Sequence, residues 1–350
     1  MKARNTTLKI FSGGTDIFPA LENYFKSFKY SDSIKSEADT AEIVLADAAH
    51  NLLKKGVIPA KNSELNINII KQNWNSRILT ETNPTLNLPL GYFELDKIIY
   101  QGTPTELHLK LTTIPSKKGL RGVERHVSWE NTTLNRIAAD IAARAGLQLF
   151  YDVEDIEIKR AEQNSSDLAF LKTLCRNNGL NLKIADKKMI IFDAETYENK
   201  SPVITVARDG EILKQFSFEM KSDDVYSDAN VNFLGNGISD LLSNFGVDLG
   251  EFGGLISDFA STDSGGDVLN INEHIADLAE GERLKKSLLH DKNKDELTAR
   301  FTFSGSFSFL AGNTFEVTGF DMFDGKYICD RTEHNISDGY TTTVQAHRGK

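Results

Sequence analysis

The chain has 350 residues, of which 40% are hydrophobic and 26% charged, a composition typical of a folded protein with two or three domains. No apolar stretch approaches the roughly 20 residues that span a bilayer, the N-terminal residues lack the apolar core of a signal peptide, and two cysteines are too few for a disulfide framework. The net charge of −10 offers no basic surface for nucleic acid, so we expect neither sequence-specific nucleic-acid binding nor membrane association.

Alternating polar and apolar residues run from residue 7 to residue 114, most clearly at 65–69 and 107–111. This period of two predicts half-buried strands, and several in series predict a sandwich or barrel. Residues 73–90, with two prolines and many asparagines and threonines, form the longest expected loop. We therefore assign residues 1–115 to a first β-barrel.

The pattern changes to helical spacing after Trp129. Asn131, Thr132 and Thr133 are candidate N-caps for an apolar stripe that ends at Gly146, and Ser165 and Ser166 precede a second stripe that ends at Gly179. Residues 180–192 then predict a hairpin that turns at Asp186 and Lys187. Residues 116–200 are expected to form a small α+β module.

Strand patterns return in residues 201–234 and 297–350, which we assign to a second β-barrel. The clearest strand is expected at 301–309, where four phenylalanines share one face (Phe301, Phe303, Phe307 and Phe309) and Gly305 permits a bend or a close approach. A weak internal repeat accompanies this barrel. Residues 60–63, followed by Leu65 and Ile67, resemble residues 311–314, followed by Phe315 and Val317. Residues 91–96 resemble 325–330, and the register continues to Leu107 and Leu109 against Thr341 and Thr343. The sequence thus favours two copies of one barrel.

Residues 235–296 interrupt the second barrel with a glycine-rich and helical insertion. An apolar stripe with acidic residues on its other side runs through 238–259, and a further helix is expected from Glu273 to about Asn293. The stripe is compatible with core packing inside the insertion, with docking onto a spike or neighbouring subunit, or with a membrane surface, which its acidic side disfavours. The candidate interface residues are Ile238, Leu241, Phe245, Leu249, Phe252 and Phe259.

The residue patterns of known catalytic and cofactor sites are absent from the sequence. Gly235 and Gly237 resemble the start of a dinucleotide loop, but Asp240 stands where the third glycine is needed and would repel a pyrophosphate. The histidines are scattered without metal-ligand spacing. We therefore expect no enzymatic activity, no cofactor and no metal.

Four segments, in order along the chain, resemble the late-control protein D family, the baseplate hub proteins of contractile phage tails and related injection systems. They are residues 39–45, residues 128–147, residues 163–171 and residues 325–343. The resemblance implies an α+β, mainly β fold in which two antiparallel barrels like those of tail tube proteins carry an inserted α+β domain. It also implies a homotrimer coaxial with the tail tube.

Such a hub would join a sixfold tail tube to a threefold central spike and would contact other baseplate proteins. It would assemble in the host cytoplasm and remain in the baseplate of the particle. We expect an acidic channel surface, past which DNA slides without sticking. The alternative is a cell-wall component that binds or hydrolyses peptidoglycan through the helical module at 129–192.

Overall fold

A computed structural model describes residues 4–34, 38–74, 85–116, 119–210, 212–221, 226–233, 268–273 and 278–349. The first β-module contains β1 (Asn5–Ser12), β2 (Thr15–Asp16), β3 (Phe25–Ser33), β4 (Thr40–Ala46), β5 (Glu64–Gln72), β6 (Leu86–Gln101) and β7 (Glu106–Thr112). Three short helical segments flank these strands, α1 (Phe18–Leu21), a 3₁₀ turn (Glu22–Tyr24) and α2 (Leu52–Lys55). Part of the loop predicted at 73–90 is therefore strand, since β6 already begins at Leu86.

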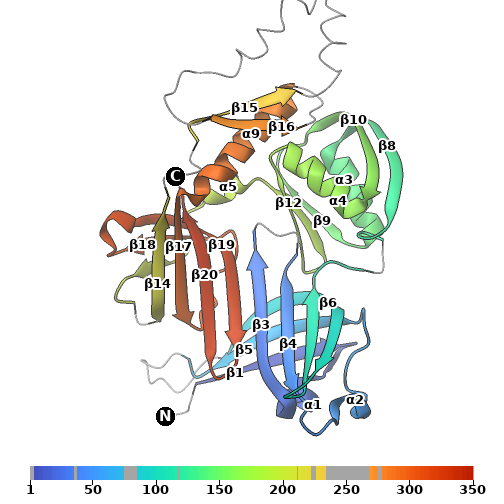
Figure 1. Ribbon diagram of the computed structural model, residues 1–350, viewed down its shortest axis with the longest axis vertical. Coiled ribbons are helices and arrows are strands. Elements are labelled where there is room, and N and C mark those ends of the chain that lie inside the picture. The colour runs from blue at the N-terminus through green and yellow to red at the C-terminus, as the bar shows by residue number, and fades with distance from the viewer. Residues whose placement is uncertain are drawn as a thin grey trace, which may run out of the picture.

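The second β-module contains β13 (Thr205–Ala207), β14 (Leu213–Met220), β17 (Leu297–Ser304), β18 (Thr314–Thr318), β19 (Gly325–Ile336) and β20 (Tyr340–Arg348), with a 3₁₀ turn at Asp321–Phe323. Both modules belong to one sheet in the order β14-β17-β20-β19-β3-β4-β7-β6-β5-β1-β2, with β18 beside β19 and β13 beside β18. Figure 1 shows the strands from β14 to β4 side by side, with β5 and β1 behind them. This confirms the expected α+β, mainly β fold.

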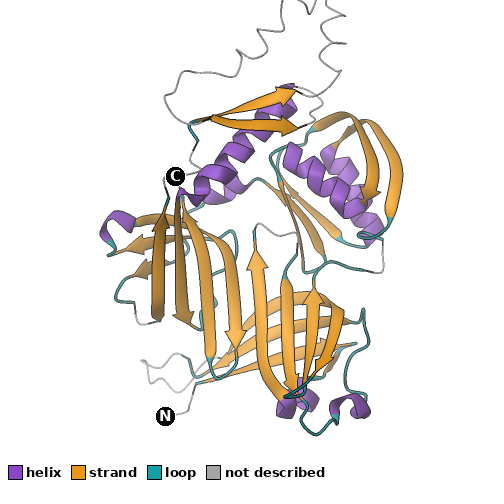
Figure 2. Ribbon diagram, viewed as in Figure 1, coloured by secondary structure: helices purple, strands orange, loops and turns teal. Residues whose placement is uncertain are grey.

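The α+β module lies between the two β-modules in sequence and carries most of the helix, as Figure 2 shows. It contains β8 (Glu124–Thr133), α3 (Leu134–Ala145), β9 (Gln148–Asp152), β10 (Glu157–Ser166), α4 (Asp167–Asn177), β11 (Asn181–Ala185), β12 (Lys188–Phe192) and α5 (Ala194–Glu198). The side chains of Thr133 and Ser166 cap α3 and α4 as predicted, and Asp186 and Lys187 form the hairpin turn with positive φ. Local sequence signals thus determine most of this module.

Strand β15 (Asp228–Phe233), within the residues predicted for the second β-barrel, pairs instead with β16 (Val268–Glu273) of the insertion and lies outside the large sheet. The described part of the insertion also contains α9 (Leu278–Asn293) and a 3₁₀ turn (Lys294–Glu296). The helix expected from Glu273 does not include that residue, because Glu273 pairs with Phe233 in a parallel strand pair; the described helix covers Leu278–Asn293. Within the described residues, no helix is long and apolar enough to cross a bilayer.

The two β-modules repeat one strand topology. In chain order β3, β4, β5, β6 and β7 correspond to β14, β17, β18, β19 and β20, and the neighbours of each strand correspond as well. Leu65 lies opposite Phe93 in the first module, as Phe315 lies opposite Tyr327 in the second. These residues are the ones that the sequence repeat aligns, so the predicted duplication is confirmed.

Irregularities of the backbone repeat too. Against its hairpin partner, each long strand shifts register once at an equivalent position, between Leu95 and Lys97 in β6 and between Cys329 and Arg331 in β19. The register read from the sequence is wrong by one residue in the last strand. Core-facing Leu107 and Leu109 correspond to Thr342 and Val344, one position beyond the predicted match. The reason is that the chain from Asn335 to its partner Thr341 is one residue longer than the equivalent stretch from Gln101 to its partner Glu106.

The phenylalanine-rich strand is shorter than predicted. Strand β17 ends at Ser304, and Gly305 follows with a φ of +46°. Phe301, Phe303 and Phe309 are buried in the core of the second module, whereas Phe307 packs against the core of the first. The Gly305 carbonyl accepts a hydrogen bond from the Lys71 ammonium at 2.7 Å. The bend at Gly305 therefore joins the two modules.

We expect Gly305→Ala to lower the free energy of unfolding by about 1–3 kcal/mol, because a Cβ there would overlap its neighbours. That atom would lie 2.4 Å from the Tyr340 ring and 2.8 Å from the Trp74 ring. Gly339→Ala is the matched control, since a Cβ at Gly339 meets nothing within 4 Å. Urea unfolding of both variants measures the difference, and equal losses would contradict the packing argument.

A buried ion cluster attaches the α+β module to the sheet. The Lys183 ammonium of β11 pairs with Asp32 of β3 and lies 2.9 Å from Asp39, and all three side chains are nearly inaccessible. Burial and the charge of Asp32 raise the pKa of Asp39, although Lys183 acts in the opposite direction. The lysine is therefore the cation that two buried carboxylates share.

Candidate functional site

The continuous sheet contains an internal junction between the two β-modules. Strand β19 pairs antiparallel with β3, and this pairing sets Thr332 opposite Asp32 and His334 opposite Tyr30. The rings of His334 and Tyr30 stack with centroids 5.8 Å apart. Since β19 corresponds to β6 and β3 corresponds to β14, the modules join head to tail, with the β6-type strand of one module against the β14-type strand of the other.

The same two strand types form the open edges of the sheet. Among the described residues, β14 pairs only with β17, and residues 97–101 of β6 pair only with β7 after β5 diverges at Glu94. An unpaired strand edge presents free N–H and C=O groups and is a template for further pairing. Within the described part of the chain, one edge of each type that the internal junction uses is therefore unpaired.

Exposed apolar side chains lie along both open edges. Ile98 and Tyr100 of β6 are 37% and 41% exposed, and Phe216 and Met220 of β14 are 46% and 53% exposed. All four point to the core side of the sheet, because their cross-strand neighbours are core residues of β7 and β17. Phe28, which corresponds to Phe216 in the repeat, is fully buried. At the internal junction, strand β19 lies beside β3 and Phe28 is buried, whereas at the open edges the apolar residues are exposed.

The register of the repeat gives the partner that each exposed residue lacks. In each module, four residues lie side by side on neighbouring strands. In the first module they are Ile98, Leu109, Ile43 and Phe28, and in the second module the equivalent residues are Thr332, Val344, Phe301 and Phe216, in the same order. By this correspondence Tyr100 takes the position of His334, Phe218 that of Tyr30, and Met220 that of Asp32. An edge-to-edge contact built like the internal junction would set Ile98 opposite Met220 and Tyr100 opposite Phe218.

Known structures share the fold of this chain. A tail protein from Neisseria meningitidis aligns with a TM-score of 0.67 at 12% identity, covering 98% of this chain and 96% of that one. The 43 kDa tail protein of prophage MuSo2 from Shewanella oneidensis aligns with a TM-score of 0.66 at 10% identity, covering 99% and 97%. The chain has the fold of phage tail proteins.

A component of the Escherichia coli type VI secretion system, described as similar in structure to tail proteins of bacteriophage T4, also shares this tail-protein fold. It aligns with a TM-score of 0.55 at 11% identity and covers 98% of this chain and 77% of that one. No family profile matches the sequence, and no curated protein matches it by sequence. The fold likeness therefore extends beyond detectable sequence similarity.

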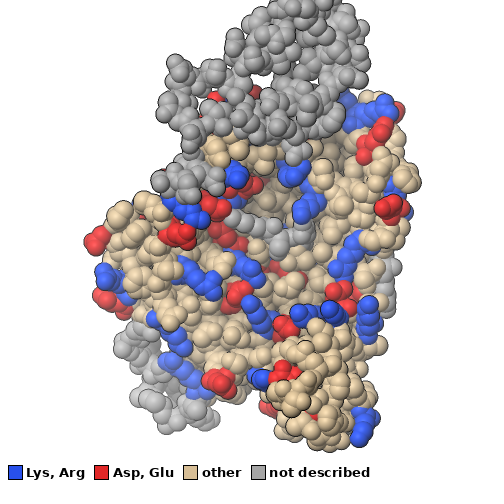
Figure 3. Space-filling model, in the orientation of Figure 1, with Lys and Arg blue, Asp and Glu red and all other residues tan. Residues whose placement is uncertain are grey.

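The face of the sheet opposite the core carries charges of both signs, as Figure 3 shows over the front strands. Register and alternation place on it basic Lys29, Lys97, Lys110, Arg300 and Arg331 and acidic Glu42, Glu106, Glu219 and Glu333. We call this the open face. Several of these charges are paired: Lys29 of β3 lies 3.2 Å from Glu333 of the neighbouring strand β19, and Arg331 lies 2.7 Å from Glu333 within β19. The net negative charge of the chain is not concentrated here.

The interface residues predicted from the sequence, Ile238, Leu241, Phe245, Leu249, Phe252 and Phe259, lie outside the described residues. Sequence reasoning also missed the open edges, because exposure at Ile98 and Met220 depends on which strands pair. A signal was present in the internal repeat, which aligns a buried strand with an exposed one. Two of the scattered histidines, His290 and His347, meet at a single carboxylate.

Proposed function

We propose that this protein is a structural ring component of a phage tail or a related injection system, the baseplate hub between tail tube and spike. The main observation in support is the internal head-to-tail junction between β19 and β3. The equivalent strands, β6 and β14, have unpaired edges in the described part of the same sheet. Copies joined through these edges would extend the sheet by the contact that the chain already makes within itself. Contacts of this heterologous kind generate closed rings when the rotation closes.

A ring of three copies would present six alike β-modules. This arrangement would match a sixfold tail tube on one side, while the α+β module and the insertion, present once per copy, would keep threefold symmetry for a central spike. The tube, the spike and other baseplate proteins are the partners that this geometry fits. The protein would then act in the baseplate of the assembled particle.

The open face would line the channel of such a ring, because the core and the strands β5 and β1 occupy the other side. Its mixed, mutually paired charges would give a hydrophilic wall without a strong field of either sign. We therefore replace the expected acidic channel with a charge-balanced one. DNA or protein would pass because the wall offers neither a basic surface nor an exposed apolar one.

Disulfide trapping tests the ring. In the double variant Ile98→Cys/Met220→Cys the new thiols would lie directly opposite each other in neighbouring copies, where Cβ atoms are about 4.5–5.5 Å apart. We expect mild oxidation to give a ladder on denaturing gels that ends at the trimer. The native thiols Cys175 and Cys329 are buried and should not contribute.

The controls separate the proposed contact from other associations. Each single cysteine variant should remain uncrosslinked, because the contact joins unlike edges. The double variant Ile98→Cys/Gln215→Cys should also remain uncrosslinked, since Gln215 lies further along β14 and on the open face. A dimer formed by Met220→Cys alone, or a ladder without an end, would contradict the closed ring.

A further inference from the structure

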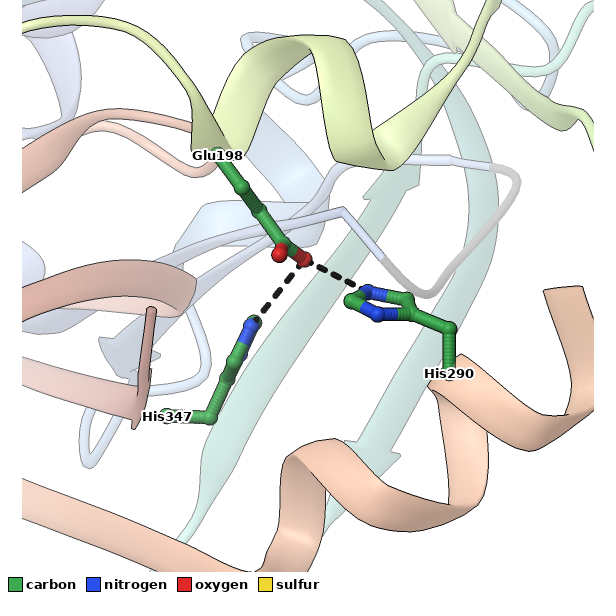
Figure 4. Close-up of side chains that lie close together, drawn as sticks. All are labelled: Glu198, His290 and His347. Atoms are coloured by element: carbon green, nitrogen blue, oxygen red, sulfur yellow. Dashed lines mark hydrogen bonds and ion pairs between the residues drawn. The ribbon is translucent and has the colours of Figure 1, made fainter. Parts of the chain in front are cut away.

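Three side chains from distant parts of the chain converge beside the second β-module (Figure 4). Glu198 ends α5, His290 lies in α9 and His347 lies in β20. The Glu198 Oε1 atom is 2.7 Å from His290 Nε2 and 3.2 Å from His347 Nε2. The three potential ligand atoms all lie within 4.8 Å of one another. Glu198 and His347 are buried and His290 is half-buried, so the group is shielded from bulk water.

A fourth residue orients one of the imidazoles. Asp330 Oδ2 lies 2.9 Å from His347 Nδ1, which turns Nε2 of the same ring toward Glu198. A carboxylate on the far nitrogen of a histidine is the usual outer partner of a metal-bound imidazole, where it fixes the ring and increases its basicity. The other oxygen of Asp330 is buried without a hydrogen-bond partner among the described residues. The Asp330 carboxylate thus orients the His347 ring through this hydrogen bond.

The donor set and its spacing fit zinc. Two imidazole nitrogens and one carboxylate oxygen form a common zinc ligand set, and bonds of about 2.0–2.2 Å place tetrahedral ligands about 3.4 Å apart. The observed spacings of 2.7 Å, 3.2 Å and at most 4.8 Å bracket that value. Side-chain rotations would therefore bring the three atoms to bonding distance of one ion without moving the backbone.

Space for a fourth ligand exists beside the cluster. A cavity of about 300 Å³ is lined by Glu198, His290, His347, Lys294 and other residues. The ammonium of Lys294 pairs with Asp291, so its charge is balanced by a neighbouring carboxylate. Without a metal, burial alone would lower the pKa of His347, but hydrogen bonds to Asp330 and Glu198 raise it to about 9. A bound cation would take the place of the proton between His347 and Glu198.

We propose that Glu198, His290 and His347 bind a zinc ion, with Asp330 as the residue that positions His347. The ion would connect the end of the α+β module, the helix of the insertion and the last strand of the second β-module. These elements are far apart in sequence, and the hydrogen bonds between Glu198 and the two histidines join all three at one point. The site would therefore be structural, and it is independent of ring assembly.

Calorimetric titration of the full chain with ZnCl₂, after treatment with a chelator, tests the site. We expect one zinc per chain with micromolar or tighter affinity. His290→Ala and His347→Ala should each weaken binding at least about 100-fold, and Asp330→Asn about 10- to 100-fold. His126→Ala is the control, because His126 is exposed on β8 and bonded to Asn164, and it should bind like the wild type.

Cobalt substitution of the wild-type protein gives a readout that does not depend on the variants folding. A Co²⁺ ion in this site should show the intense visible absorption of a tetrahedral centre with nitrogen and oxygen ligands, and zinc should displace it. The proposal fails if the wild type binds no zinc, if His290→Ala and His347→Ala bind as tightly as the wild type, or if cobalt shows only the weak octahedral spectrum.

Discussion

Met220→Asp is expected to leave the protein folded and to abolish its association into rings. Met220 is 53% exposed at the end of β14, so a carboxylate there remains hydrated in the isolated chain. In the proposed ring the same position lies opposite Ile98 of the next copy. Enclosing an unpaired charge in that contact costs about 3 kcal/mol or more, which raises the dissociation constant at least about 100-fold. Sedimentation velocity over a range of concentrations measures the change.

Gln215→Asp provides the matched comparison. It adds the same charge to the same strand, but Gln215 belongs to the open face, where charged residues already alternate. We expect this variant to associate like the wild type. If both aspartates weaken association equally, the effect is one of net charge on the strand, and the core side of the edge is not the contact.

Lys183→Met should lower the free energy of unfolding by about 3–5 kcal/mol, because it leaves two buried carboxylates without their shared cation. Asp32 and Asp39 both contact the Lys183 ammonium, and both are almost fully buried. Their mutual repulsion would then act in a region where water is excluded. Chemical unfolding followed by fluorescence gives the difference.

The control for this variant is Lys188→Met on the neighbouring strand β12. Lys188 is exposed and lies 4.0 Å from Asp186, a surface pair that contributes at most about 1 kcal/mol. Neutralising the carboxylates should rescue stability, so the triple variant Lys183→Met/Asp32→Asn/Asp39→Asn should regain much of the loss. A triple variant as unstable as Lys183→Met would show that packing, and not charge, is responsible.

Local sequence patterns predicted which elements form more reliably than the residues at which those elements begin and end. Helix caps at Thr133 and Ser166 and the turn at Asp186 follow from short-range hydrogen bonding and backbone preference, which the sequence states directly. The end of β17 did not follow, because Gly305 bends the chain to meet Lys71, a residue far away in sequence. The alternating pattern alone had predicted that the strand extends to Phe309.

The candidate sites required three-dimensional information. Ile98 and Met220 are ordinary apolar strand residues in sequence, and only the strand order shows that both lie at open edges. His290 and His347 are separated from Glu198 by 92 and 149 positions, so no ligand spacing was visible. The internal repeat was the exception, because it aligned equivalent residues before their environments were known.

The strand order also constrains how the chain folds during its synthesis. Strand β3 emerges from the ribosome early, yet its outer neighbour β19 is the second-last strand to be made, and the contact between Ser31 and Arg331 spans 300 positions. The edge of β3 therefore stays unpaired for most of translation, and a second nascent chain on the same messenger RNA could pair with this edge. We expect premature exchange of this edge between neighbouring nascent chains to be the main way in which production of the protein fails.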